Sequence, residues 1–125
     1  MDYDSLTAYL ESKTGSRRDM PFGADTLVFK VLDRMFALVA WQTDPLTMTL
    51  KADPVDAVIL RKTYPAVKAG YYMNKKHWNT VTLDGSIPDE EIRRMIDESY
   101  ALVVQGMTRA KQEQLRRMGW MEDEA

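Results

Sequence analysis

The ten residues Tyr71–Thr80 differ in chemistry from the rest of the chain. They combine aromatic rings, two adjacent lysines, the chain's single histidine and two asparagines. Aromatic rings stack on nucleobases, ammonium groups pair with phosphates, and amides hydrogen-bond to base edges, so these types suit nucleic acid. A structural alternative stays open, with Trp78 and Tyr71 as packing residues, the lysines as a solvated turn and the asparagines as turn formers.

His77 is the natural candidate for a catalytic base, because it is the chain's single histidine. Such a base needs an orienting partner and a nucleophile, and the sequence has no cysteine, no second histidine and no Gly-x-Ser-x-Gly motif. We therefore expect no enzyme activity and no catalytic residue, with His77 packed, hydrogen-bonded or contacting an anion when protonated. An enzyme acting on a small anion around His77 is the remaining catalytic alternative.

The sequence offers no recognisable metal or cofactor site. Without cysteine it cannot build a disulfide, a zinc ribbon, an iron–sulfur cluster or a redox pair. The acidic run Asp89–Glu91 falls in the first turn of a predicted helix, where carboxylates favour the positive end of the helix dipole. The glycines form neither a P-loop nor a dinucleotide-binding fingerprint. We expect no metal and no cofactor.

Positive charge is concentrated in the middle of the chain. The net charge of -2 and the pI near 5.4 argue against a protein that coats nucleic acid without specificity. Residues 51–80 nevertheless hold six Lys and Arg against two Asp, a local net of +4, so we expect any anion-binding surface to be local. The predicted nucleic-acid contacts are Asn74, Lys75, Lys76, His77, Trp78, Asn79, Arg61, Lys62 and Lys68, with Lys51 as a further phosphate contact and Trp78 or Tyr71 as the stacking aromatic.

Length and composition predict one domain over residues 1–125, with a flexible acidic tail at 121–125. A hydrophobic fraction of 45%, a charged fraction of 29% and a mean hydropathy of -0.41 are typical of globular proteins. The longest apolar run, Met35–Trp41, is far shorter than the roughly 20 residues of a membrane-spanning helix. The N-terminus is acidic where a signal peptide is basic. We expect a cytoplasmic protein with no membrane partner.

Hydrophobic spacing predicts one helix and three strands in the first half of the chain. Residues 4–13 carry apolar side chains at i, i+3 and i+4, and Gly15 ends this helix. After the polar stretch 16–19, turns separate three runs of strand-forming residues, at 27–32, 35–41 and 46–51. The third run alternates apolar and polar residues, so we expect a sheet with one buried face and one partly solvated face.

Capping signals predict the elements of the second half. Asp53 as N-cap and Pro54 open a helix that ends at about Thr63, before the Tyr64-Pro65 pair. Residues 67–83 form two predicted strands around a turn near 74–76.

Two predicted helices close the chain. Ser86 and Asp89 form a capping pair for a long helix, and a last helix, 108–118, ends at Gly119. The order α-βββ-α-ββ-α-α predicts an α+β fold, with a mostly antiparallel sheet and helices on one face.

Several of these segments resemble the MmcQ/YjbR family. The most specific match joins Asn74–Val81 (Asn-Lys-Lys-His-Trp-Asn-Thr-Val) to Leu83–Asp89 (Leu-Asp-Gly-Ser-Ile-Pro-Asp). Shorter matches are Val28–Val31, Met35–Leu38, Leu50-Lys51 with Pro54, and Leu60-Arg61. The resemblance spans nearly the whole chain and implies a small α+β fold like that of secretion chaperones and a DNA-binding role. It makes Asn74–Asn79 the family signature, without assigned roles.

Two positions depart from the family pattern. Tyr72 stands where the family often has histidine, which weakens any two-histidine site, and Asp33-Arg34 replaces a glycine-containing turn.

Our leading hypothesis is a small non-enzymatic cytoplasmic module that binds DNA through the basic and aromatic turn 74–79. The alternative is a protein–protein interaction or dimerisation domain, with another protein or a second copy as its partner. The secretion-chaperone-like fold, the nine methionines and the overall acidity favour this alternative.

Overall fold

The chain is described by a computed structural model that covers residues 1–70 and 73–121. Its helices are α1 (Tyr3–Glu11), α2 (Pro54–Thr63), α3 (Asp89–Gln105) and α4 (Arg109–Arg117). Its strands are β1 (Ser16–Asp19), β2 (Thr26–Val31), β3 (Arg34–Ala40), β4 (Thr47–Lys51), β5 (Val67–Ala69) and β6 (Trp78–Thr82). Tyr71, Tyr72 and residues 122–125 of the predicted flexible tail lie outside the described residues.

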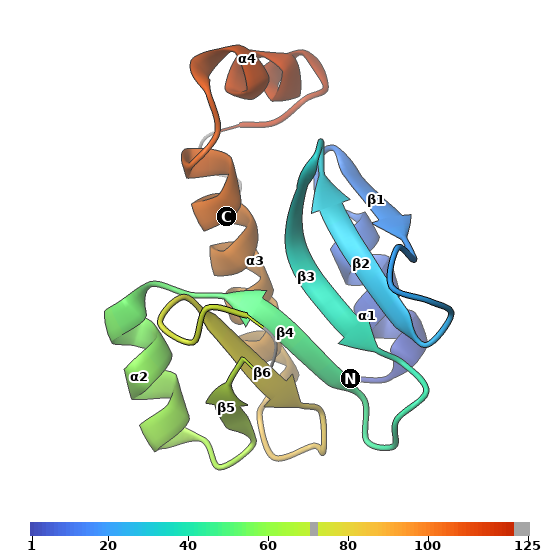
Figure 1. Ribbon diagram of the computed structural model, residues 1–125, viewed down its shortest axis with the longest axis vertical. Coiled ribbons are helices and arrows are strands. Elements are labelled where there is room, and N and C mark those ends of the chain that lie inside the picture. The colour runs from blue at the N-terminus through green and yellow to red at the C-terminus, as the bar shows by residue number, and fades with distance from the viewer. Residues whose placement is uncertain (71–72, 122–125) are drawn as a thin grey trace.

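Within these residues the strands form one antiparallel sheet in the order β1-β2-β3-β4-β6-β5. Figure 1 shows α1 and α3 behind the sheet, α2 beside β5 and β6, and α4 beyond the C-terminal end of α3. The predicted α+β class, with helices gathered against an antiparallel sheet, is therefore confirmed.

The two faces of the sheet differ as the alternation in the sequence predicts. On β4 the side chains of Met48 and Leu50 are buried, and those of Thr47, Thr49 and Lys51 are half-buried. The neighbouring β6 repeats this pattern, with every second side chain in the core. The second face carries a hydrogen bond between the hydroxyls of Thr49 and Thr80 at 2.9 Å. One face thus packs on the helices and the other is partly open to solvent.

The sheet opens between β3 and β4 at one end. Their pairing extends only to Ala37 opposite Leu50, and Figure 1 shows β3 curving away from β4 beyond that point. The fully buried Ser99 of α3 bridges the gap, because its hydroxyl donates to the Phe36 carbonyl at 2.6 Å and accepts from the Lys51 N–H at 2.9 Å. The backbone groups that the separated strands leave unpaired are therefore satisfied by a helix residue.

The structure adds one strand to the predicted order. The stretch 16–19, which we expected to be a polar connection, forms β1 and pairs with β2 at the edge of the sheet. Its sequence, Ser-Arg-Arg-Asp, has no apolar residue to signal a strand. Charged residues are common on edge strands, where one side of the backbone has no partner.

One predicted cap is wrong and two are confirmed. Ser86 does not cap α3: its N–H and hydroxyl donate to the Asp84 carboxylate at 3.0 and 2.6 Å, and Pro88 occupies the N-cap position. Asp53 caps α2 as expected, accepting from the Val55 N–H at 3.0 Å. The C-cap of α4 is Met118, and Gly119 follows it with a positive φ of 107°, which is the usual place of a glycine at a helix end.

None of the helices within residues 1–70 and 73–121 combines the length and the apolar composition needed to cross a membrane.

Candidate nucleic-acid interface

The basic turn is residues Asn74–His77, which precede β6. The Asn74 carbonyl accepts from the N–H groups of His77 and Trp78 at 3.1 and 3.0 Å, and its side-chain oxygen accepts from the Lys76 N–H at 3.0 Å. Asn74, Lys75 and Lys76 are exposed, and His77 is half-buried. Asn74 therefore acts as the residue that closes the turn, and the two lysines lie at its exposed tip.

Arg61 of α2 fixes this turn to the body of the protein. Its Nε donates to the Asn79 side-chain oxygen at 2.7 Å, and its Nη2 donates to the Lys75 carbonyl. The Asn79 amide nitrogen in turn donates to the Ala57 carbonyl at 3.2 Å. A chain of hydrogen bonds thus links α2, the turn and β6.

Asn79 does not lie where a nucleic-acid contact requires it. Its exposed fraction is 2%, and both ends of its side-chain amide are bonded inside the protein. The prediction of a direct contact by Asn79 is therefore corrected: this residue positions Arg61. Sequence reasoning had no signal for this burial, since asparagine is mostly exposed in proteins.

Trp78 and Lys51 stand opposite each other on β6 and β4, on the open face of the sheet. The His77 carbonyl accepts from the Ala52 N–H at 2.8 Å, which continues the pairing past the strand end. Gly70 donates to the Trp78 carbonyl at 2.9 Å, and a Cβ at Gly70 would lie 3.0 Å from the Trp78 Cβ. Backbone contacts on both sides thus fix the position of Trp78.

A hollow of about 290 Å³ lies beside Trp78, at the end where β3 and β4 separate. It is lined by Arg34, Met35, Lys51, Trp78, Val103 and Gly106. Arg34 was missed by sequence reasoning, because the sequence places it in a predicted turn far from the basic middle of the chain; in the structure it is the first residue of β3. Only the tertiary fold brings it to Lys51.

The cations of residues 51–80 have no acidic partners within the described part of the chain. The ion pairs among the described residues use the Met1 ammonium, Lys13, Arg18, Lys30, Arg94, Lys111 and Arg116. By contrast, Lys51, Arg61, Lys62, Lys68, Lys75 and Lys76 form no ion pair with residues 1–70 and 73–121. The positive charge that the sequence concentrates there is left uncompensated by the fold.

The remaining predicted contacts lie around this region without touching the turn. Lys68 is exposed on β5, opposite Thr80 and on the same face as Trp78. Lys62 is exposed in the last turn of α2, next to Arg61. Lys51, Trp78 and Lys68 therefore lie on the neighbouring strands β4, β6 and β5, with the turn directly before β6. Lys62 lies on the adjoining helix α2.

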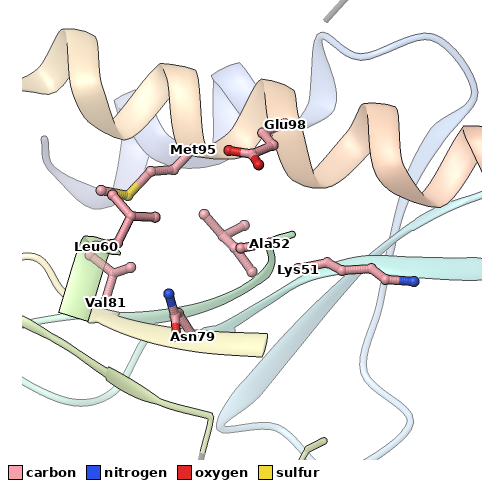
Figure 2. Close-up of a pocket in the computed structure, with 8 residues that line it drawn as sticks. Lys51, Ala52, Leu60, Asn79, Val81, Met95 and Glu98 are labelled. Carbon is pink, nitrogen blue, oxygen red and sulfur yellow. The ribbon is translucent and has the colours of Figure 1, made fainter. Parts of the chain in front are cut away.

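A second space, between α2, α3 and the sheet, is part of the packed interior. Figure 2 shows Glu98 and Met95 projecting from α3 toward Asn79 and Leu60, with Lys51 pointing away. The space holds about 10 Å³, which is room for about one water. Burial raises the pKa of the Glu98 carboxyl, and the nearby Asp56 carboxyl raises it further. This space is too small for a ligand.

No group of three or more Asp, Glu or His side chains suited to a metal ion occurs within the residues the structure covers.

Comparison with known proteins places this geometry in a family. A sequence model of the YjbR family matches residues 11–102. The chain belongs to the YjbR family. The resemblance inferred from the signature 74–79 is thereby confirmed, and the match contains the turn and all but two residues of the hollow, Val103 and Gly106.

The YjbR relatives agree over most of their length. Escherichia coli YjbR (strain K12) is 34% identical over 104 residues, covering 83% of this chain and 88% of the relative. YbdF of Escherichia coli O157:H7 is 35% identical over 96 residues, covering 77% and 79%. Both are named as uncharacterized proteins, so they supply a family and no activity.

Solved structures share the fold. The crystal structure of the Deinococcus radiodurans protein DR2400, of the domain family DUF419, is 38% identical with a TM-score of 0.88, covering 99% of this chain and 94% of that one. A crystal structure of a Pseudomonas syringae protein is 29% identical with a TM-score of 0.71, covering 82% and 98%.

Proposed function

We propose that this YjbR-family protein is a non-enzymatic module that binds DNA through the basic turn and the cations around it. The observation that carries the proposal is the set of uncompensated cations in residues 51–80, two of which lie on an exposed turn beside a tryptophan. Phosphate contacts supply much of the affinity of DNA-binding proteins, and they need cations that are not already paired.

The rigidity of the turn supports this function. Arg61 and Asn79 hold the turn through a chain of hydrogen bonds that reaches from the Lys75 carbonyl to the buried side chain of Asn79, so Lys75 and Lys76 are presented on a backbone that is already ordered. Binding then costs less conformational entropy than it would on a flexible loop. Because the net charge of the chain is -2, attraction at long range is weak and affinity should be modest and sensitive to salt.

The test is the affinity for a labelled DNA duplex, measured by fluorescence anisotropy over a range of salt concentrations. Reversing both charges with Lys75→Glu and Lys76→Glu should weaken binding strongly. It should also lower the slope of log affinity against log salt by about 0.9 for each phosphate that the variant no longer binds. Circular dichroism of the double variant should match that of the wild type, because both side chains are exposed.

A matched control distinguishes an effect of the turn on affinity from an effect of net charge. Arg17→Glu with Arg117→Glu changes the net charge by the same amount at exposed sites on β1 and α4, and β1 is at the other end of the strand order from β6 and β5. This control should retain most of the affinity. If the Lys75/Lys76 variant binds as tightly as the wild type, the turn is not the binding site.

A second candidate function is self-association, and the surface of α2 favours it. Val55, Val58 and Ile59 are exposed to 67%, 43% and 53%, on the side of the helix opposite the buried Ala57 and Leu60. Contiguous exposed apolar side chains of this kind mark interaction surfaces. This candidate corresponds to the dimerisation alternative of the sequence, and it can coexist with DNA binding.

A further inference from the structure

We propose that the hollow beside Trp78 binds one unpaired nucleobase together with its phosphate, and that the protein therefore prefers single-stranded DNA to duplex. This inference rests on the proposed DNA-binding function and names the form of DNA that the site takes. It concerns residues beyond the basic turn, so it can fail while that function stands.

The hollow is a built feature of the fold. The separation of β3 from β4 creates it, and the Ser99 bridge keeps the two strands apart without leaving their backbone groups unpaired. α3 lines the hollow with Val103 and, at the end of the helix, with Gly106, which has no side chain to fill the space. Its volume of about 290 Å³ is near the lower end of the range for small-molecule sites.

The lining has the chemistry of a nucleotide site. Trp78, Met35 and Val103 offer an aromatic ring and apolar surface, and Lys51 and Arg34 offer two cations. No carboxylate belongs to the lining, and neither cation forms an ion pair with the described residues. The Trp78 indole N–H likewise has no hydrogen-bond partner among them. A flat aromatic group that carries negative charge matches all of these features.

The position of the hollow favours a base that belongs to a strand. Trp78 follows the turn directly, and Lys51 stands opposite it, so phosphates bound at Lys75 and Lys76 lead toward the hollow. In a duplex the bases are stacked and paired inside the helix and cannot enter a pocket without being unstacked, which costs free energy. A single strand has free bases, which stack on aromatic side chains without that cost.

The experiment compares three probes by anisotropy and competition: a labelled twelve-residue oligothymidylate, a duplex of the same length, and thymidine monophosphate. The oligothymidylate should bind most tightly. Trp78→Ala should lower its affinity at least about fivefold, the lower limit for loss of a stacked base, and should lower duplex affinity by much less. Charge reversal at Lys75 and Lys76 should weaken binding of both the oligothymidylate and the duplex.

A second variant tests the hollow without removing Trp78. Gly106→Leu places a side chain in the hollow, and a Cβ there would meet only carbonyl oxygens of its own helix, at 3.6 and 3.7 Å. It should reduce single-strand affinity as Trp78→Ala does. Gln105→Leu is the matched control, because Gln105 is exposed on the same helix and does not line the hollow; its affinity should equal that of the wild type.

Each other outcome has a definite meaning. Equal affinity for duplex and single strand, unaffected by Trp78→Ala and Gly106→Leu but reduced by the lysine reversal, overturns this inference and leaves the proposed function standing. Thymidine monophosphate binding as tightly as the oligomer also overturns it, because the ligand is then a free nucleotide. An absence of binding to every probe overturns both proposals.

Discussion

Asn79 is a polar residue that the fold buries and uses to hold the basic turn. It accepts from Arg61 and donates to the Ala57 carbonyl at an exposed fraction of 2%. Asn79→Ala removes both bonds: the Arg61 Nε–H loses its acceptor, and the Ala57 carbonyl keeps only its bond within α2. Leaving a partly buried donor without a partner costs about 1–3 kcal/mol. We expect the free energy of unfolding, measured in urea, to fall by about 2 kcal/mol.

The same substitution should also affect binding. Because Arg61 then loses its bond to β6 and keeps only its bond to the turn, affinity for DNA should fall even at temperatures where the protein stays folded. Lys62→Ala, at an exposed neighbour of Arg61, is the control for stability and should change the unfolding free energy by less than about 0.5 kcal/mol. Unchanged stability of Asn79→Ala would show that the Arg61 contact contributes nothing to the fold.

At the scale of elements, the contact between α2 and α3 contains two carboxyl groups. Burial of Glu98 raises the pKa of its carboxyl above the usual value, the Asp56 carboxyl raises it further, and Arg94 at 3.5 Å opposes both effects. The folded state therefore holds the Glu98 proton more firmly than the unfolded chain. Stability falls as the pH rises from about 4.5 through the folded-state pKa, because the folded protein must then lose that proton.

Glu98→Gln should remove this pH dependence. The variant should match the wild type near pH 4 and be more stable than it at pH 8, with the difference growing across the interval between. Urea denaturation at a series of pH values measures this difference in the free energy of unfolding. Glu113→Gln, at an exposed site on α4, should shift stability little and by a similar amount at each pH. A wild type that is more stable than Glu98→Gln at pH 8 would contradict a raised pKa of Glu98.

Most elements could be predicted because their signals are local. Asp53 and Pro54 mark the start of α2 by themselves, and the alternation in 47–51 marks β4. β1 and the role of Asn79 could not be predicted, because both depend on partners distant in sequence: β1 pairs with β2, and Asn79 bonds to α2. The hollow depends on the separation of β3 from β4 and on Ser99, for which no short motif exists.

At the scale of the molecule, the sheet and α2 together place the basic turn beside a second exposed surface. Arg61 bonds the turn from one side of α2, and the apolar side chains Val55, Val58 and Ile59 cover another. Two copies that associate through α2 would therefore bring two basic turns into one particle. Linked sites on one ligand bind more tightly than either alone, so association and DNA binding would reinforce each other.

The apolar surface of α2 specifies how the two copies would meet. In an antiparallel pair centred near Ile59, the exposed apolar side chains of one copy pack on the same side chains of the other, so the surface is complementary to itself. We expect light scattering to give twice the chain mass of 14.4 kDa at high protein concentration. Ile59→Glu should restore the single-chain mass, because a charge would then lie at the centre of the contact. Ala110→Glu on the exposed face of α4 should have no effect. A single-chain mass at every concentration, or a dimer that persists in Ile59→Glu, would exclude α2 as the interface.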